Sequence, residues 1–324
     1  MSANEINDVK PSALNHIIGQ KSVIAQVAVA LEAAFADAKK MDDCLLVGPP
    51  GLGKTQVATV IAAELASDFH EVLGQAIRSS ADLNAVLLGA KDKDVVFIDE
   101  THELPKEQQT ALYLALDQRK VLLSGGKSGR TPQAIPLANF TLLLASTDEF
   151  CLLQPLRDRM KLLLRFQFYA PDELATIVRH RSNALGWQTH DEVLSLIARR
   201  SRGTPRLALR LLQSCRRVCR AEGEESITKR HLDRACQLEQ IDGLGMGHSE
   251  QKYVSILGEG PCRLNVIASR LGLPARTVSQ VIEPFLIRSG MVGKDDQGRR
   301  ILTAFGHEHL STLRPIDGEK VSNE

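Results

Sequence analysis

The sequence predicts an α/β fold, with a parallel sheet covered on both faces by helices, followed by an α-helical lid and a C-terminal winged helix. Four apolar runs alternate with helix-like segments, and they are residues 44–47, 95–98, 140–145 and 162–168. Such alternation is typical of buried parallel strands. The first run leads directly into the glycine-rich segment GPPGLGKT at 48–55, and beyond about Pro171 the strand-like runs stop.

The composition of the 324 residues is that of a soluble protein, with 43% hydrophobic and 24% charged residues. This length allows two or three domains, each with its own core. No apolar run approaches the ~18 residues of a membrane span, and the polar start of the chain does not resemble a signal peptide. The cysteines are scattered, so we expect buried thiols rather than disulfides or a metal site at Cys215 and Cys219. The sequence therefore predicts a cytoplasmic protein without membrane contact.

The segment 48–55 has the pattern of a phosphate-binding loop between a strand and a helix. Its glycines let the backbone turn tightly, so that N–H groups can point at phosphate oxygens. Lys54 supplies a positive charge for the β- and γ-phosphates, and the Thr55 hydroxyl is suited to hold Mg²⁺. We therefore expect ATP and Mg²⁺ in the first domain, which we place at residues 1–170.

Two further strand ends carry side chains suited to ATP hydrolysis. Asp99 and Glu100 follow the buried run at 95–98, where Asp99 would hold Mg²⁺ and Glu100 would polarise the attacking water. Thr147 follows the run at 140–145, and its hydroxyl would orient water near the γ-phosphate. Together with the phosphate loop, these residues predict an ATP hydrolase.

Arginines at two places are candidates for contact with the nucleotide. The segment PLRDRM at 155–160 offers Arg157 and Arg159. In a ring of ATPases an arginine here can reach the γ-phosphate on the neighbouring subunit and stabilise transition-state charge. Arg206, in SRGTPR at 201–206, lies at the start of a lid helix, from which it could contact the nucleotide of its own chain. Without the surrounding motifs, all three would be interpreted as solvated surface arginines.

Residues 171–246 are predicted to form the helical lid. Four short amphipathic helices are expected at 171–185, 191–200, 204–221 and 228–240. Asp191, Thr204 and Thr228 are at plausible N-cap positions, and Pro205 fits the first turn of its helix. A glycine-rich break, IDGLGMGH, then separates the lid from the last domain.

The last domain, at residues 247–314, has the pattern of a winged helix-turn-helix. Helices are expected at 249–257, 264–271 and 275–289, followed by two short strands around the turn KDDQGRR. In such a domain the third helix can enter a DNA groove. The tail at 315–324 is predicted to be disordered.

The net charge of +1 conceals an uneven distribution. Residues 1–170 carry 17 Lys and Arg against 20 Asp and Glu, a net charge of −3. The lid, with 13 against 10, and residues 247–314, with 9 against 6, each carry +3. A basic C-terminal half is compatible with a polyanionic partner such as DNA, although charge alone is a weak signal.

These motifs give the chain a resemblance to the bacterial RuvB family of AAA+ ATPases over nearly its whole length, from KPSALNHIIGQ at 10–20 to AFGHEHL at 304–310. The most specific segments are GPPGLGKT, QPLRDRM, ARRSRGTPRLALRLL and IEPFLIRSG, of which the last two are not expected in a generic AAA+ protein. The resemblance implies an ATP-driven motor that migrates Holliday junctions in recombination and repair. It also implies a hexameric ring around duplex DNA and recruitment by a partner, RuvA.

The resemblance implies roles for single residues as well. Lys10 and the stretch Ile17–Ile18 would lie beside the adenine, and Tyr169 would lie by the nucleotide. Arg159 resembles the arginine finger that acts on the neighbouring subunit, and Arg206 resembles the sensor in the lid. The loop positions implied to bind the nucleotide are Gly51, Leu52, Gly53, Lys54, Thr55 and Gln56.

The wing departs from the family pattern. Lys294 and Arg299 correspond to the two basic positions that face DNA. The family usually has Arg-Thr-Pro-Arg-Gly-Arg here, whereas this chain reads KDDQGR, which adds Asp295 and Asp296 and removes an arginine. Because phosphate contacts dominate duplex binding, we expect weakened affinity for DNA.

Other departures lie nearer the nucleotide and in the hairpin. Glu103 and Asp148 stand where the family has arginines, and Gln56 replaces the second hydroxyl of the phosphate loop. The stretch 117–119 falls at a nucleotide-proximal position of the family but has other residue types. The hairpin region 124–137 is more polar than the surface expected to dock RuvA.

Three functions remain open at this point. The first is an ATP-driven translocase on Holliday junctions, with movement between sheet domain and lid passed around the ring by Arg159. The second is a RuvB-like paralogue that hydrolyses ATP but remodels another nucleoprotein target, which the altered wing and hairpin favour. The third is a nucleotide-gated DNA-binding regulator, against which the intact Glu100, Arg159 and Arg206 argue.

Overall fold

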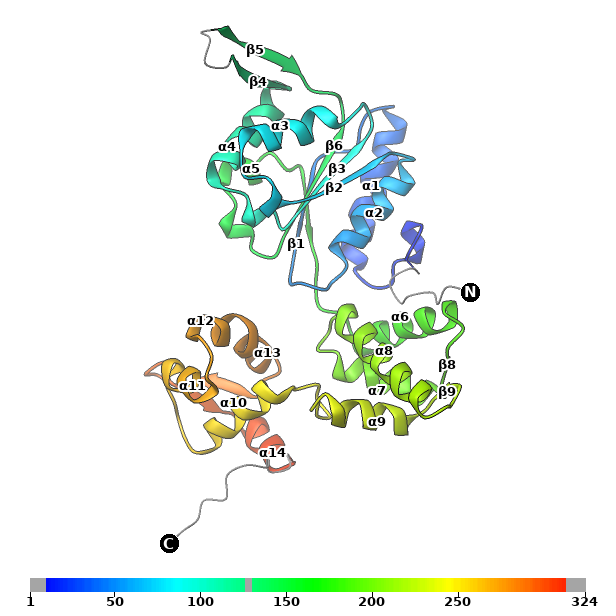
Figure 1. The fold of residues 1–324 in the computed structure, drawn as a ribbon, viewed down its shortest axis with the longest axis vertical. Coiled ribbons are helices and arrows are strands. Elements are labelled where there is room, and N and C mark those ends of the chain that lie inside the picture. Colours follow the sequence, from blue (N-terminus) through cyan, green and yellow to red (C-terminus); the bar gives the residue numbers. More distant parts are fainter. Residues whose placement is uncertain (1–9, 126–129, 313–324) are drawn as a thin grey trace. The chain divides into compact units, whose positions relative to one another are not determined.

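The computed structural model describes residues 10–125 and 130–312 (Figure 1). The predicted tail at 315–324 lies outside the described residues. The chain divides into two compact units, Met1–Leu185 with Thr204–Arg206 and Gly186–Gly203 with Leu207–Glu324. The first helix of the predicted lid thus belongs to the first unit, the second and fourth belong to the second unit, and the third begins in the first unit and continues in the second.

The first unit is built on a five-stranded parallel sheet with the order β2-β3-β6-β1-β7. The strands are β1 (Cys44–Val47), β2 (Phe69–Leu73), β3 (Val95–Asp99), β6 (Thr141–Ser146) and β7 (Leu162–Arg165). The predicted α/β fold is confirmed. The sequence analysis did not identify β2, because this edge strand is half-exposed and lacks a continuous apolar run.

Helices cover both faces of this sheet (Figure 1). They are α1 (Lys21–Ala36), α2 (Lys54–Glu64), α3 (Ser80–Gly89), α4 (Lys106–Gln118) and the short α5 (Gln154–Arg157). On the face of α3 and α4, strand residues such as Ile98 and Leu144 pack with Leu83 and Leu112 in one buried cluster. Both faces of the strands are therefore buried, which explains their continuous apolar runs.

A two-stranded antiparallel hairpin follows α4 in the same unit. It consists of β4 (Lys120–Gly125) and β5 (Arg130–Pro136), with a shift of register between Leu123 and Gly125. It coincides with the region 124–137 that sequence analysis singled out, of which residues 126–129 lie outside the described part of the chain.

The lid contains the four predicted helices, α6 (Pro171–Ala184), α7 (Asp191–Arg200), α8 (Pro205–Ala221) and α9 (Lys229–Leu238). The short parallel strands β8 (Gln188–Thr189) and β9 (Ser226–Ile227) pair with each other. Thr228 is the N-cap of α9, as predicted. Asp191 is not the N-cap of α7, because His190 has that position and Asp191 is the first helical residue, where a negative charge suits the helix dipole. Cys215 and Cys219 are buried thiols of α8.

The last part of the chain is a winged helix. Its elements are α10 (His248–Gly258), α11 (Leu264–Leu271), α12 (Ala275–Thr277), η5 (Val278–Ile282), α13 (Glu283–Arg288), β10 (Val292–Lys294), β11 (Arg300–Leu302) and α14 (Ala304–Thr312). One buried cluster joins them, with Tyr253 and Leu257 of α10 packed among Ile267, Leu286 and Met291. The predicted winged-helix fold is confirmed.

The predicted single helix at 275–289 is interrupted by a π turn, η5. Within it the N–H of Glu283 bonds to the carbonyl of Val278, five residues back. Pro284 explains the turn, because proline has no N–H for the carbonyl four residues earlier and its ring would clash there.

Among the described residues, no helix is long and apolar enough to cross a membrane.

Candidate nucleotide and DNA sites

The phosphate loop connects the end of β1 to the start of α2, and glycine is required within it. Gly48 has φ 154°, and a Cβ there would lie 2.8 Å from the carbonyl oxygen of Phe166. Gly53 is the N-cap of α2 with φ 95°. Both conformations are ones that residues with a side chain rarely adopt. The loop therefore brings backbone N–H groups to the N-terminus of α2, where anions are favoured.

Lys54 is buried in this loop, with 6% of its surface exposed. Its ammonium donates to the carbonyl oxygens of Gly48 (2.7 Å) and Pro49 (3.1 Å). Burial lowers the pKa of Lys54, against the opposing effect of the Glu100 and Asp99 carboxylates. Both of these partners are uncharged carbonyl oxygens, whereas a phosphate would be an anionic partner for the ammonium.

Thr55 and Asp99 form the candidate magnesium site. The Thr55 hydroxyl donates to Oδ2 of Asp99 over 3.1 Å, and Oδ1 accepts the N–H of Glu100 at 2.8 Å. One hydroxyl and one carboxylate side by side are hard oxygen ligands, and Mg²⁺ is usually held by one or two such groups together with phosphates and water. The residues present therefore fit this ion.

Glu100 lies just beyond β3 in a left-handed conformation, with φ 47°. Its backbone carbonyl lies so close to Gly74 that a Cβ at that position would be 2.5 Å from the oxygen. Its carboxylate accepts a long hydrogen bond from the hydroxyl of Thr147, at 3.5 Å. The predicted water-polarising acid and the predicted water-orienting hydroxyl are therefore adjacent, although they come from different strands.

His102 is a neighbour of this pair that the sequence analysis did not single out. Its Nδ1 lies 3.4 Å from Oε2 of Glu100, and its Nε2 lies 3.5 Å from the Thr147 hydroxyl. The two acidic replacements, Glu103 and Asp148, are both neighbours of this ring. Nε2 lies 3.6 Å from Glu103, and hydrogen bonding by Cys151, with a smaller contribution from His102, lowers the pKa of Asp148. The segment DETHEL held the signal, because its histidine is two residues after Glu100.

Of the residues expected near the adenine and the nucleotide, Tyr169 contacts the phosphate loop directly. Tyr169 is buried, and its hydroxyl donates a hydrogen bond to the carbonyl of Leu52 (3.2 Å). Burial raises the pKa of Tyr169 to about 12. A Cβ at Gly19 would lie 2.7 Å from the Tyr169 ring, so the half-buried Ile18 is next to a residue that packs on this tyrosine. Lys10 is exposed at the start of the described chain.

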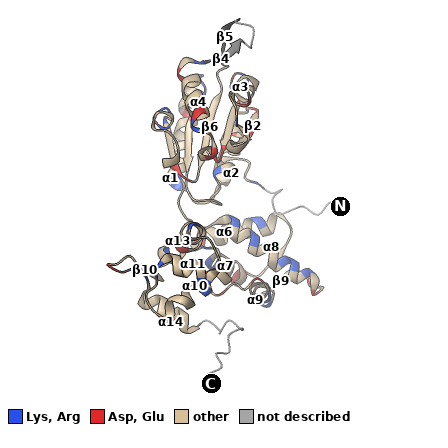
Figure 2. Ribbon diagram, turned by 60° about the vertical axis from the view of Figure 1, so that its left-hand side comes forward, with Lys and Arg blue, Asp and Glu red and all other residues tan. Residues whose placement is uncertain are grey.

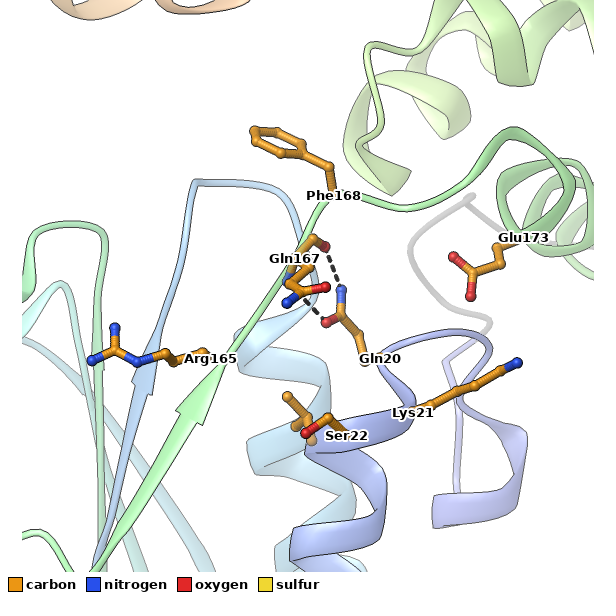
Figure 3. A pocket seen from close by; sticks show the side chains of 8 residues that line it. Gln20, Lys21, Ser22, Arg165, Gln167, Phe168 and Glu173 are labelled. Atoms are coloured by element: carbon orange, nitrogen blue, oxygen red, sulfur yellow. Dashed lines mark hydrogen bonds between the residues drawn. The ribbon is translucent and has the colours of Figure 1, made fainter. Parts of the chain in front are cut away.

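Gln20 fastens the segment after Ile18 to the strand-to-lid connection. Its amide nitrogen donates to the carbonyl of Gln167 (2.7 Å), and its amide oxygen accepts the N–H of Gln167 (3.0 Å). Figure 3 shows this two-bond pairing in a pocket at the start of α1. Because Tyr169 is two residues after Gln167, the pairing positions both expected nucleotide neighbours.

Arg206, the predicted lid sensor, lies beside the phosphate loop. Its backbone N–H approaches the carbonyl of Gly51 at 3.4 Å, and a Cβ at Gly51 would lie 3.0 Å from Cβ of Arg206. Its side chain is exposed, and its charge contributes to the lowered pKa of Lys54. The guanidinium is thus available to an anion in the same site.

Gln56, which stands where the family has the second hydroxyl of the phosphate loop, is half-buried on α2.

Arg159 is held by its own chain. Its guanidinium forms a two-pronged pair with Asp117 and donates Nη1 to the carbonyl of Pro155 at 2.6 Å. It also lies over the ring of Tyr113, 4.7 Å from the centroid. The hydrogen bond from Arg159 lowers the pKa of Asp117. Arg157 instead faces Glu149, at 4.0 Å.

The wing places its two predicted DNA-binding residues in different environments. Lys294 is exposed at the end of β10. Arg299 pairs with Asp295 across the turn, with Nε 2.7 Å from Oδ2. Desolvation would raise the pKa of Asp295, but hydrogen bonds from Arg299 outweigh it and the pKa is lowered. The next residue, Arg300, forms a largely buried pair with Glu283 at 2.6 Å.

Lys and Arg residues gather on the lid helices α8 and α9 (Figure 2).

Near the connection between α8 and α9, the side chains of Glu222, Glu224 and His231 lie close enough to suggest a metal site. However, Nδ1 of His231 accepts the N–H of Thr228 (3.0 Å). A neutral ring that accepts at Nδ1 carries its proton on Nε2, which then donates to Glu224 (3.1 Å) and offers no lone pair to a metal. Arg230 pairs with both glutamates, so this group is a hydrogen-bonded ion cluster.

Three family profiles match successive parts of the chain. The profile described as Holliday junction DNA helicase RuvB P-loop domain matches residues 9–166. The RuvB AAA lid domain matches residues 169–242, and the RuvB C-terminal winged helix domain matches residues 243–311.

Individual relatives agree with these profiles. The Holliday junction branch migration complex subunit RuvB of Kosmotoga olearia is 36% identical over 312 residues, which cover 94% of this chain and 91% of the relative. The RuvB Holliday junction branch migration motor of Thermotoga maritima superposes with a TM-score of 0.80 at 33% identity, covering 94% of this chain and 99% of that one. A point mutant of the same protein superposes with a TM-score of 0.82, also at 33% identity and over the same shares of both chains. The chain described here belongs to the RuvB family.

Proposed function

We propose that this protein is an ATP-driven motor that moves Holliday junctions along DNA during recombination and repair. The observation that carries the proposal is that one chain combines an assembled phosphate site with a winged helix, and that each part matches the corresponding RuvB profile.

Nucleotide binding would begin with an exchange of partners at Lys54. The ammonium now donates to two neutral carbonyls, and the β- and γ-phosphates of ATP would replace them with anionic oxygens. Loop N–H groups and the N-terminus of α2 would bind further phosphate oxygens. Arg206, whose backbone approaches Gly51, would contact the same nucleotide from the lid. Ile18 and Tyr169 would line its base and ribose.

Thr55 and Asp99 would hold Mg²⁺, which neutralises charge on the phosphates when bound. The chain's own groups would prepare the nucleophile. Glu100 would polarise a water molecule whose oxygen forms a bond to the γ-phosphorus, while the bond from phosphorus to the ADP oxygen breaks. Thr147 would orient this water, because its hydroxyl already lies 3.5 Å from the Glu100 carboxylate.

Completion of the site would require a neighbouring subunit in a ring, which the family resemblance implies to be a hexamer. Arg159 would extend to the γ-phosphate of that neighbour and stabilise the charge of the transition state. In the single chain its guanidinium is paired with Asp117, so it would exchange or share this partner when subunits assemble. Turnover would then depend on assembly.

The winged helix would bind duplex DNA through the wing residues Lys294 and Arg299, and a RuvA partner would recruit the ring to the junction. A second candidate is a RuvB-like ATPase that acts on a different nucleoprotein. The specific observation in its favour is the Asp295–Arg299 pair, which weakens one of the two predicted phosphate contacts.

Migration of a synthetic four-way junction, with ATPase followed in the same tube, tests the proposal. We expect ATP-dependent migration that RuvA accelerates. ATPase stimulated by DNA without migration, even with RuvA present, would favour the second candidate. Sequence-specific duplex binding without stimulation of ATPase would contradict both and indicate a nucleotide-gated regulator.

A further inference from the structure

Arg202 lies in the turn between α7 and α8 and contacts three separate segments of the second unit. Its Nε donates to the carbonyl of Gly245 at 2.7 Å, and its Nη1 donates to Oε1 of Glu250 in α10, also at 2.7 Å. Its guanidinium carbon lies 4.6 Å from the centroid of the Phe285 ring in α13. One side chain of the lid therefore bridges to the linker and to two helices of the winged helix.

The winged helix returns this contact. Nη2 of Arg288 in α13 donates to the backbone carbonyl of Arg202 at 2.8 Å, and Arg288 also lies over Phe285, 5.8 Å from the centroid. The side chains of Arg202 and Glu250 are 20% and 11% exposed, so the ion pair is largely shielded from solvent. Loss of one partner from such a pair is much more damaging than loss of a surface pair. We call these four residues the Arg202 clamp.

The linker at 241–248 is bonded along its length, although its glycines suggested a break. Asp242 accepts the N–H of Met246 at 2.8 Å and pairs with His309 of α14 at 2.8 Å. Gln251 of α10 donates to the carbonyl of Met246, also at 2.8 Å. These bonds hold the linker to the winged helix from both sides.

Gly245 holds the linker against the lid. A Cβ at this position would lie 2.1 Å from the carbonyl oxygen of Arg200 at the end of α7, and its φ is 83°. Glycine is therefore needed here for a close approach of two backbones, and not for freedom of movement. Next to it, the N–H of Gly247 bonds to Oε2 of Glu250 at 3.1 Å, so one carboxylate receives both the linker and Arg202.

The chain passes between its two compact units at three places, and two of them are at other glycines. The boundaries lie at Leu185–Gly186, at Gly203–Thr204 and at Arg206–Leu207, the last inside α8. Gly186 has φ 66° and Gly203 has φ 77°, and a Cβ at Gly186 would have no heavy atom within 4 Å. Residues at such positions can absorb changes of φ and ψ during domain movement.

We propose that the Arg202 clamp joins α7–α9 and the winged helix into one rigid arm, which hinges at Gly186 and not at the linker 241–248. Arg202 is then a positioning residue for the motor, because it acts on the winged helix through Glu250 and Phe285.

The arm would carry changes at the nucleotide to the DNA. Arg206, three residues after Gly203, bonds through its backbone to Gly51 of the phosphate loop. If this contact shifts during the ATP cycle, α8 transmits the shift from Arg206 directly to the arm, and no flexible joint absorbs it before the winged helix. This consequence rests on the proposed function.

The test compares Glu250→Gln, Arg202→Ala and the double variant with Arg270→Ala in the full-length protein. Arg270 is a matched control, because it is also an arginine paired with a glutamate, Glu259, within the winged helix. Glu250→Gln keeps the size of the side chain and protects against simple loss of fold. Four quantities are measured, namely amide hydrogen exchange at 243–247, duplex affinity, ATPase without DNA, and stimulation of ATPase by junction DNA.

We expect faster amide exchange in the linker for both single variants, with duplex affinity and DNA-free ATPase close to those of the parent protein. Stimulation by junction DNA should fall by between about 5- and 150-fold, the usual size of coupling between sites. The double variant should be no worse than Arg202→Ala, because both changes remove the same bridge. Arg270→Ala should behave like the parent.

Two results would overturn the inference. Unchanged exchange in the linker would mean that Arg202 does not hold the joint. Faster exchange with undiminished stimulation would mean that the joint lies outside the coupling path. If the parent protein showed no stimulation by DNA, the proposed function would fail, and the exchange comparison would still decide whether the clamp makes one rigid arm.

Discussion

The nucleotide site and the wing both present a basic side chain to phosphate, but they hold it differently. Lys54 donates to two neutral carbonyls, so an arriving phosphate brings the cation a better partner. Arg299 is already paired with the carboxylate of Asp295, whose lowered pKa keeps it charged at neutral pH. A DNA phosphate must therefore compete with an anion. The presence of a basic residue is therefore not enough to predict phosphate affinity. The group that the residue pairs with in the free protein must also be known.

The size of this difference is modest. A partly exposed ion pair is worth about 0.2–1 kcal/mol, whereas a hydrogen bond to a charged group is worth about 1.5–3 kcal/mol. The Asp295 pair thus offsets part of one phosphate contact and does not remove it. We expect the wing to bind DNA weakly and the phosphate loop to bind nucleotide normally.

The largest expected effect concerns the completion of the nucleotide site by a neighbour. Arg159→Ala should leave nucleotide binding nearly unchanged and lower kcat by at least about 10³-fold, the usual contribution of an arginine finger. Steady-state ATPase and nucleotide titration measure the two quantities. Arg165→Ala is the control, because Arg165 is an exposed arginine of the same unit with its own partner, Glu149.

Mixing separates action on the neighbour from action within the chain. A mixture of Arg159→Ala and Glu100→Gln subunits should regain part of the ATPase, because some interfaces then contain one intact Glu100 and one intact Arg159. If mixing restored no activity, Arg159 would lose its assignment to the neighbouring site.

The next largest effect tests the nucleotide side of the comparison. Lys54→Ala should lower ATPase by about 10²–10³-fold, since it removes a positioned cation from the developing charge on the phosphates. Lys161→Ala, which removes an exposed lysine paired with Asp42, should have little effect. Similar losses in both variants would show that general destabilisation, and not the loop, accounts for the result.

The smallest effect tests the wing. Asp295→Asn keeps an oxygen for the N–H groups of Gln297 and Arg299 but releases the Arg299 guanidinium. Duplex affinity should rise up to about tenfold, and the slope of log affinity against log salt should steepen by about one unit. Asp296→Asn is the matched control and should do less. Salt titrations with duplex DNA measure both effects.

Replacement of the whole wing segment should give a larger change of DNA affinity in the same assay. Replacing the wing segment by Lys294→Arg, Asp295→Thr, Asp296→Pro and Gln297→Arg should raise affinity by more than about tenfold, because it adds two guanidinium groups and removes two acids. Equal affinities for the graft and the natural wing would show that the wing is not the main DNA contact of this chain.

Sequence patterns were sufficient to predict most of this architecture, and the exceptions have physical causes. Long buried runs such as 140–145 are visible because both faces of the strand are apolar. The edge strand β2 alternates between partly buried and exposed positions and was missed for that reason. The π turn of η5 depends on how a helix accommodates Pro284, which periodicity does not reveal.

The candidate sites divide in a similar way. The contacts of Lys54 lie within one loop, and the pairing of Thr55 with Asp99 joins two ATPase motifs that the sequence shows, so motif patterns anticipate both. The partners of Arg159 and His102 come from segments far away in sequence or from long side chains with many rotamers. Their pairings therefore required the structure. The glycine-rich linker shows the converse, because glycine was interpreted as freedom and serves close contact instead.

The π turn has a further consequence for the winged helix. A turn with one extra residue shifts the angular phase of everything after it by about 100°, the rotation of a single residue in an α-helix. The start of the helix, at α12, and its end, at α13, therefore present faces that an unbroken helix would not combine. Phe285 and Arg288, which contact Arg202 of the lid, both lie after this offset. The π turn therefore sets which side chains α13 presents at the Arg202 clamp.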